Sequence, residues 1–175
     1  MMQKKNREET VVHTFCPVFD ENSRVLMLGT MPSPKSREQG FYYGHPRNRF
    51  WPVLADLLGE PAPETIEEKK SLALRHHIAV WDVLAGCDIC GADDSSIKNP
   101  VSNDMNVIFS RADIKAVFTT GTNAAELYGR YCFSQTGIAS VRLPSPSPAK
   151  CRNGSEKLRA DYSQILKYLK NANFT

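Results

Sequence analysis

Short apolar runs recur along the chain and predict buried strands. Residues 24–29 (RVLMLG) are apolar apart from the first, and they follow the turn-forming residues 20–23 (DENS). Comparable runs cover residues 78–81, 115–119 and 139–143. Continuous apolar runs of this length are typical of strands buried on both faces, as in a parallel sheet. The pattern therefore predicts four interior strands.

Apolar residues at helical spacing lie between these runs. Those between positions 50 and 58 share one face of a predicted helix that Gly59 ends. Proline is tolerated only in the first turn of a helix, so Pro52 places Asn48 at or near the cap. Further helices are predicted at 65–76, which opens with the capping box Thr65-x-x-Glu68, at 103–111, at 122–131 with Thr122 as cap, and at 158–169.

The alternation of strands and helices predicts an α/β fold. We expect three layers, α/β/α, in which helices cover both faces of a central, mainly parallel four-stranded sheet. Residues 15–175 are predicted to form one domain. Residues 1–14 are rich in charge and have no apolar segment behind them, so they are predicted to be a flexible N-terminal arm.

Composition narrows the class of protein. The chain has 175 residues, of which 41% are hydrophobic and 23% charged, and no apolar run approaches the roughly 18 residues of a membrane span. We expect a cytoplasmic monomer. Five cysteines are an odd number, which favours reduced thiols. Cys87 and Cys90 have the spacing of a zinc or redox pair, but no second such pair follows, so we expect no metal, cluster or other cofactor.

Candidate chemistry gathers where three of the predicted strands end. Residues 29–34 (GTMPSP) follow the first strand, Asp82 ends the second, and residues 143–148 (LPSPSP) follow the fourth. Ligands of parallel sheets bind at the carboxyl ends of the strands. Serine hydroxyls and free amides can donate to phosphate oxygens, whereas the alternative is that both proline-rich loops are merely rigid turns. Residues 40–54 (GFYYGHPRNRFWPVL) add aromatic rings and arginines. This combination suits a ligand that has both a flat group and an anionic group.

These motifs resemble those of the uracil-DNA glycosylase superfamily. The resemblance rests on the G-x-x-P-S loop at 29–33, the Y-G-H-P-R-N-R-F-W segment at 43–51 and the L-P-S-P loop at 143–146. It covers nearly the whole chain, and within the superfamily the sequence is most similar to the hypoxanthine-DNA glycosylase branch. Two positions depart from the common pattern. Met31 stands where many branches have a water-positioning Asp, Asn or Glu, and Leu143 stands where many have His.

The resemblance to the hypoxanthine branch implies that Asn48 is the catalytic residue, which orients water or reads the base. The alternative is that Asn48 only caps its own helix. Tyr43 would stack on an everted base; the alternative is that its ring only packs against the rest of the protein. His45 is interpreted as a residue that forms a structural hydrogen bond within a turn. The remaining assignments are base binding by Gly29, Thr30, Met31 and Asp82, and DNA binding by Ser33, Arg47, Arg49, Ser145, Ser147 and Lys150.

The predicted function is therefore a monofunctional DNA glycosylase that hydrolyses the N-glycosidic bond of hypoxanthine in damaged DNA. No lysine lies inside the matching motifs, so no Schiff-base step is indicated. Two alternatives stay open. One is a uracil glycosylase acting at G·U pairs, and the other is a non-catalytic nucleic-acid-binding protein of the same fold, which Met31 and Leu143 would permit.

Overall fold

The computed structural model describes residues 7–13, 15–148 and 154–169. Its centre is a sheet of four parallel strands in the order β3-β2-β6-β7. These strands are β2 (Val25–Gly29), β3 (Ile78–Asp82), β6 (Ala116–Thr120) and β7 (Ser140–Leu143). Every residue of β2, β3 and β6 is buried, which explains why each was visible as a continuous apolar run. The prediction of a mainly parallel four-stranded sheet is confirmed.

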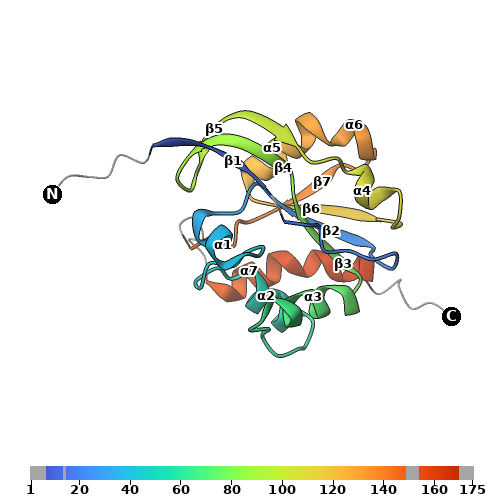
Figure 1. The fold of residues 1–175 in the computed structure, drawn as a ribbon. Coiled ribbons are helices and arrows are strands. Elements are labelled where there is room, and N and C mark those ends of the chain that lie inside the picture. The colour runs from blue at the N-terminus through green and yellow to red at the C-terminus, as the bar shows by residue number, and fades with distance from the viewer. Residues whose placement is uncertain (1–6, 14, 149–153, 170–175) are drawn as a thin grey trace.

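Helices cover both faces of this sheet (Figure 1). On one side lie α2 (Phe50–Leu57), α3 (Ile66–Arg75) and α7 (Ser155–Tyr162), and on the other lie α4 (Asn106–Phe109), α5 (Thr122–Tyr131) and α6 (Phe133–Thr136). The short α1 (Pro34–Gln39) follows β2, while a 3₁₀ turn (Ser163–Ile165) and α8 (Leu166–Leu169) follow α7. The three-layer prediction is therefore confirmed, although the long C-terminal helix predicted at 158–169 is divided by the 3₁₀ turn.

Local signals placed most helix ends correctly. Thr65 and Glu68 form the capping box at the start of α3, and Gly59, with a φ of 71°, follows α2 in the left-handed region that glycine favours. The prediction that Thr122 caps α5 is wrong. Gly121 occupies the cap position with a φ of 99°, and Thr122 is the first helical residue. The tight exit from β6 requires a positive φ, and this requirement outweighs the capping preference of threonine.

A second, antiparallel sheet lies beside the first and was not predicted. It contains β1 (Glu8–Val12), β4 (Leu84–Cys90) and β5 (Asp93–Ser102) in the order β1-β4-β5. The assignment of residues 8–12 to a flexible arm is therefore wrong, because they pair with β4 from Glu8↔Cys90 to Val12↔Gly86. Only Val11 of β1 is buried, so this strand has almost no apolar signature in the sequence.

The structure bears on three further expectations. None of the described helices is long and apolar enough to cross a membrane. The four described cysteines, Cys16, Cys87, Cys90 and Cys132, are free thiols. Within residues 7–13, 15–148 and 154–169, no three His, Cys, Asp or Glu side chains gather in a way that could hold a metal ion.

Candidate active site

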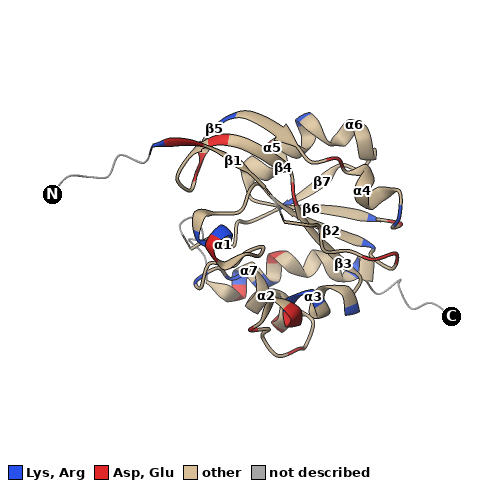
Figure 2. Ribbon diagram, viewed as in Figure 1, with Lys and Arg blue, Asp and Glu red and all other residues tan. Residues whose placement is uncertain are grey.

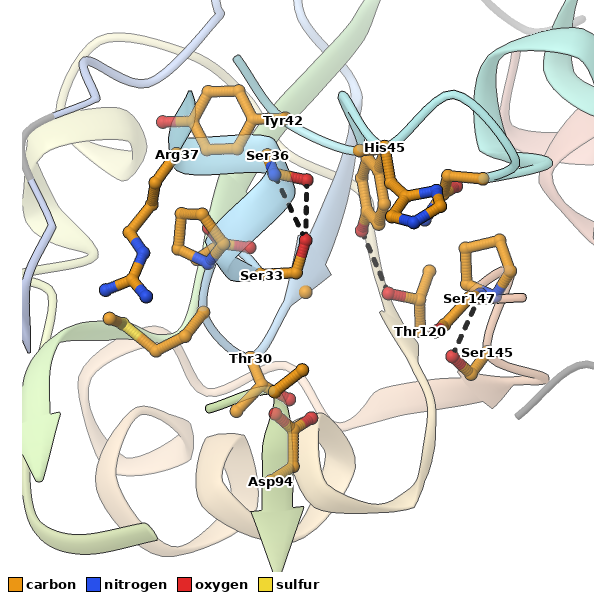
Figure 3. Close-up of a pocket in the computed structure, with 18 of the residues that line it drawn as sticks. Thr30, Ser33, Ser36, Arg37, Tyr42, His45, Asp94, Thr120, Ser145 and Ser147 are labelled. Atoms are coloured by element: carbon orange, nitrogen blue, oxygen red, sulfur yellow. Dashed lines mark hydrogen bonds between the residues drawn. The ribbon is translucent and has the colours of Figure 1, made fainter. Parts of the chain in front are cut away.

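A cavity of about 140 Å³ opens at the carboxyl ends of β2 and β3 (Figure 3). Its volume is close to that of an engineered cavity of about 150 Å³ that holds a benzene molecule, so an aromatic ring fits. The predicted residues that line it are Gly29, Thr30, Met31, Ser33, Tyr43, Asn48, Asp82, Ser145 and Ser147. Loops that are separated by up to 118 positions in the sequence thus meet around one space, as the rule for parallel sheets predicts.

Two predicted DNA-binding residues stand apart from the cavity. Arg47 and Arg49 do not line the cavity. Arg47 is exposed, and Arg49 is partly buried. Lys150 lies outside the described residues. Lys and Arg residues occur at separate places over the ribbon, among them α1 and α7 (Figure 2). The net charge of the chain is +3.

Tyr43 forms a rigid wall of the cavity. Its ring stacks on Phe50 with centroids 3.9 Å apart and planes 15° apart, and its hydroxyl lies 2.9 Å from Thr120 Oγ1. Burial raises the pKa of Tyr43 far above its usual value, so the hydroxyl stays protonated. The backbone φ of 51° is uncommon for a residue other than glycine and costs about 1 kcal/mol or more. The surrounding contacts maintain this strained conformation, which fixes the orientation of the ring.

Asn48 lies at the start of α2 as predicted, and its side chain has a structural contact. Asn48 Oδ1 accepts a hydrogen bond of 2.9 Å from the Phe50 backbone amide, although the cap position itself belongs to Arg49. The helix-capping alternative is thus realised in the geometry. It does not exclude the catalytic assignment, because an amide oxygen has two lone pairs and Asn48 also lines the cavity.

The loop after β2 is tied to the tyrosine segment by serine hydroxyls. Ser33 caps α1 by accepting from the Ser36 amide, and its Oγ donates to Ser36 Oγ over 3.1 Å. Ser36 Oγ in turn accepts from the Gly44 amide at 3.1 Å. The hydroxyl of Ser33, which we expected to bind DNA, therefore already serves as a helix cap, and the wall of the cavity is held in one conformation.

The late loop is anchored on both sides. Tyr162 of α7 donates to the Pro144 carbonyl over 2.9 Å, and the Arg49 amide donates to the Pro146 carbonyl over 3.1 Å. Ser145 Oγ accepts from the Ser147 amide at 3.3 Å. Leu143 is fully buried and does not line this cavity. Leu143, which the resemblance singled out as a departure from the common pattern, is therefore part of the core.

A larger groove of about 520 Å³ adjoins the cavity and shares Thr30, Thr120 and Ser145 with it. It continues past the carboxyl ends of β6 and β7 to the start of α5. A ring-sized cavity that opens into a polar groove can hold one flat group while a longer chain passes its entrance.

The floor of the cavity contains a buried carboxylate. Asp82, at the end of β3, accepts from His13 Nε2 at 2.8 Å and from the backbone amide of Gly29. Burial raises the pKa of Asp82 above its usual value, and the two hydrogen bonds oppose that shift. Gly29, which we expected to bind the base, thus also contacts Asp82 through its backbone amide.

The sequence did not reveal His13, which contacts Asp82, nor Arg37, Asp94 and Thr120, which line the cavity. The side chain of His13 is 1% exposed, and His13 follows β1 in the segment that we had assigned to a flexible arm. A single histidine near a charged N-terminus gives no periodic or motif signal. His45, by contrast, behaves as interpreted: its Nδ1 accepts from the Arg47 amide at 3.0 Å within the turn.

Comparison with known proteins agrees with this geometry. A sequence profile of the Uracil DNA glycosylase superfamily matches residues 16–170. A protein of Methanosarcina acetivorans named hypoxanthine DNA glycosylase is 38% identical over 156 residues, which are 88% of this chain and 97% of that protein. A protein of the same name from Methanosarcina barkeri is 34% identical over 114 residues, which cover 64% of this chain and 72% of that one.

The fold has a counterpart among solved structures. The solution NMR structure of a protein from Methanosarcina acetivorans, titled "putative Uracil DNA glycosylase", superposes with a TM-score of 0.75 at 27% identity. The match covers 90% of this chain and 99% of the other. The profile matches most of the chain, the 38% identical relative is covered over nearly its whole length, and the fold is shared. The chain therefore belongs to the uracil DNA glycosylase superfamily.

Proposed function

We propose that this protein is a monofunctional DNA glycosylase that removes hypoxanthine from damaged DNA by hydrolysing the N-glycosidic bond, as a step of base excision repair. The observation that carries the proposal is the ring-sized cavity between the Tyr43 wall and the Asp82 floor, in a chain of this superfamily. Such a space receives one flat base out of the duplex, which is how enzymes reach the atoms of a stacked base. Two relatives named hypoxanthine DNA glycosylase support hypoxanthine as the base.

The chemistry follows from what lines the cavity. Met31 cannot position water, and no lysine lines the cavity among the residues that the structure describes, so hydrolysis proceeds without a Schiff-base intermediate. The bond to the base breaks first and leaves an oxocarbenium-like sugar, which suits hypoxanthine because it is a good leaving group among purines. Asn48 then directs water to the sugar with the lone pair that Phe50 does not use.

The DNA backbone passes the entrance of the cavity in this proposal. Arg47 and Arg49 attract phosphates from the tyrosine segment, while Ser145 and Ser147 contact them from the late loop. We place the protein in the cytoplasm as a monomer.

Cleavage of defined duplexes tests the proposal. Duplexes that contain a single deoxyinosine, deoxyuridine or deoxyxanthosine are incubated with the protein, treated with alkali and analysed for strand breaks at abasic sites. We expect breaks at deoxyinosine. Preferential breaks at deoxyuridine opposite guanine would instead establish the uracil glycosylase alternative. Binding without cleavage of any duplex would contradict an enzymatic function and favour the non-catalytic alternative.

A further inference from the structure

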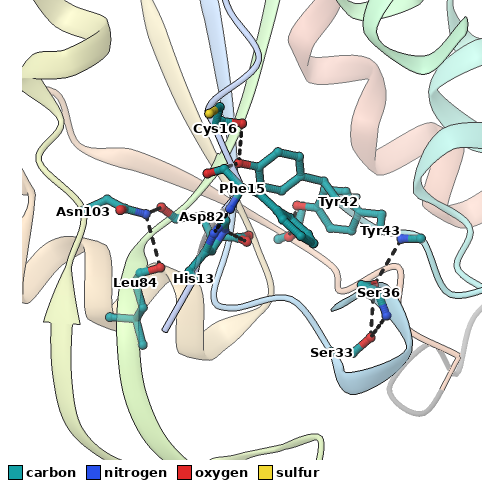
Figure 4. A network of polar contacts seen from close by, with 12 residues as sticks. His13, Phe15, Cys16, Ser33, Ser36, Tyr42, Tyr43, Asp82, Leu84 and Asn103 are labelled. Atoms are coloured by element: carbon teal, nitrogen blue, oxygen red, sulfur yellow. Dashed lines mark hydrogen bonds and ion pairs between the residues drawn. The ribbon is translucent and has the colours of Figure 1, made fainter. Parts of the chain in front are cut away.

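The contact between His13 and Asp82 joins the N-terminal strand to the floor of the cavity. The two side chains are 1% and 5% exposed, and Nε2 and Oδ2 are 2.8 Å apart. Phe15 and Tyr42 enclose the imidazole, with ring centroids 5.1 Å and 5.6 Å from it (Figure 4). His13 precedes residue 16, where the superfamily match begins. A residue from outside the matched region is therefore built into the candidate active site.

The hydrogen bonds define the tautomer of His13. The Phe15 backbone amide donates to His13 Nδ1 over 2.9 Å, so Nδ1 carries no proton. The single ring proton is consequently on Nε2, and it is donated to Asp82 Oδ2. His13 is thus a neutral donor, and the Gly29 amide is a second donor to the same carboxylate. Two donors directed at Asp82 favour its ionised, acceptor-only form.

The backbone around Asp82 is fixed as well. Asn103 Nδ2 donates to the Asp82 carbonyl at 2.9 Å and to the Leu84 carbonyl at 3.2 Å. Asp82 Oδ1 lies 2.6 Å from the point that a Cβ on Gly29 would occupy, and Tyr43 Oη lies 3.2 Å from the same point. The carboxylate and the tyrosine hydroxyl therefore converge on the space that the missing side chain of Gly29 leaves open.

We propose that His13 is a positioning residue, which holds Asp82 as a hydrogen-bond acceptor on the cavity floor so that the site selects bases with a ring N–H. This inference rests on the proposed function. Hypoxanthine carries a proton on N1, where adenine has a lone pair, and the deamination products uracil and xanthine likewise carry ring N–H groups. At that ring nitrogen, a fixed acceptor attracts hypoxanthine and uracil and repels their parent bases adenine and cytosine, whereas guanine and thymine carry a ring N–H and must be excluded by other contacts. Buried polar groups left unpaired by the wrong ligand are an effective means of such discrimination.

The test compares His13→Ala with His13→Gln. The Gln side chain still offers an N–H to Asp82, whereas Ala offers none. We expect His13→Ala to lower single-turnover cleavage of deoxyinosine by at least about tenfold, the effect of losing one hydrogen bond to a charged group. The preference of the protein for binding duplexes with deoxyinosine over duplexes with deoxyadenosine at the same position should fall with it. His13→Gln should recover most of both. A purely structural role would lower the melting temperature but leave this preference unchanged.

A second pair of variants makes the same point at Asp82. In Asp82→Asn the amide oxygen must face the His13 N–H, so its NH₂ group turns toward the cavity and the acceptor is lost. Cleavage of deoxyinosine should fall at least about tenfold. Adding His13→Ala to Asp82→Asn frees the amide to rotate, and part of the activity should return. Equal loss in the single and double variants would contradict the positioning role.

A measurement on the unmodified protein covers the case in which these variants do not fold. Nitrogen NMR of the histidine side chains at neutral pH should show His13 as the Nε2–H tautomer. An Nδ1–H or doubly protonated ring would overturn the inference. A folded, active His13→Ala with an unchanged preference for deoxyinosine over deoxyadenosine would also overturn it. If the unmodified protein cleaves no modified duplex, the proposed function fails, whereas the tautomer and the binding preference still test the inference separately.

Discussion

Replacing Asn48 by alanine and by serine separates a structural role from a catalytic one. The bond from the Phe50 amide to Asn48 Oδ1 is 2.9 Å long, and losing a cap of this kind costs about 1 kcal/mol of unfolding free energy. For a chain of this size, 1 kcal/mol lowers the melting temperature by about 2–4 °C. A protein of ordinary stability remains almost entirely folded after such a loss. The cap alone therefore cannot reduce activity by much.

Loss of the proposed water-orienting group has a larger effect. Removing one positioned catalytic group costs roughly a hundredfold in rate, or about 2.7 kcal/mol of transition-state stabilisation. Asn48→Ala should therefore lose about a hundredfold in single-turnover cleavage of deoxyinosine and a few degrees in melting temperature. Serine caps helices as well as asparagine does, but it is too short to reach the sugar. Asn48→Ser should accordingly melt almost normally and yet remain about as inactive as the alanine variant.

The assay is a time course of abasic-site formation with enzyme in excess, read beside a thermal melt of each variant. Excess enzyme removes product release from the measured rate, so the difference reports the chemical step. Near-normal cleavage by Asn48→Ser would refute the catalytic assignment, because it would show that the cap is all that position 48 provides.

Four further outcomes are expected. Tyr43→Ala should weaken binding to deoxyinosine duplexes by about 1–3 kcal/mol through lost stacking, whereas Tyr43→Phe should do much less in the same titration; equal losses would indicate that the hydroxyl matters more than the ring. Gly29→Ala places a Cβ 2.6 Å from Asp82 Oδ1, so it should lower the free energy of unfolding, measured with denaturant, by about 1–3 kcal/mol and remove most of the activity. The control is Gly129→Ala, where no described atom lies within 4 Å of the new Cβ; this variant should be neutral or stabilising. Because the pKa of Asp82 is raised, the folded state holds the Asp82 proton more tightly than the unfolded state does. Between the unfolded pKa near 3.8 and the higher folded pKa, the contribution of Asp82 to stability therefore declines as pH rises. Subtracting the pH–stability curve of Asp82→Asn from that of the unmodified protein should isolate this decline, and a difference curve of the opposite slope would contradict it. Chelators should leave cleavage unchanged, and stoichiometric zinc or iron in elemental analysis would contradict this expectation.

The parts of the fold that the sequence predicted are those in which burial is complete. β2, β3 and β6 are buried on both faces, so their sequences could not contain polar residues at alternate positions without cost. The antiparallel sheet has the opposite character. β5 contains no buried residue, and β1 contains one, so neither strand is distinguished by hydrophobicity from a loop. The pairing of β1 with β4 joins segments that lie far apart in the sequence, whereas β5 follows β4 directly and pairs with it from Cys90↔Asp93 onward.

The candidate site shows the same division. Gly29, Tyr43 and Asn48 were identifiable because they lie inside short motifs, and the structure brings them to one cavity. His13 was not identifiable, because its role depends on a partner 69 positions away. The charge of Asp82 was visible in the sequence, but nothing in the sequence distinguishes an aspartate that faces solvent from one buried under a histidine.

The two departures from the superfamily pattern acquire a physical meaning once the cavity floor is considered. Leu143 belongs to the core and Met31 to the cavity wall, so neither supplies a polar group to the bond being broken. The buried carboxylate of Asp82 lies instead at the floor of the cavity, and His13 contacts Asp82 without lining the cavity itself. If the proposed roles hold, rate and selectivity reside on different elements: Asn48 at the start of α2 governs how fast the bond is hydrolysed, and the His13–Asp82 pair governs which base enters. Variants of Asn48 should then lower cleavage of deoxyinosine and deoxyuridine by similar factors, whereas variants of His13 should change the preference for deoxyinosine over deoxyadenosine.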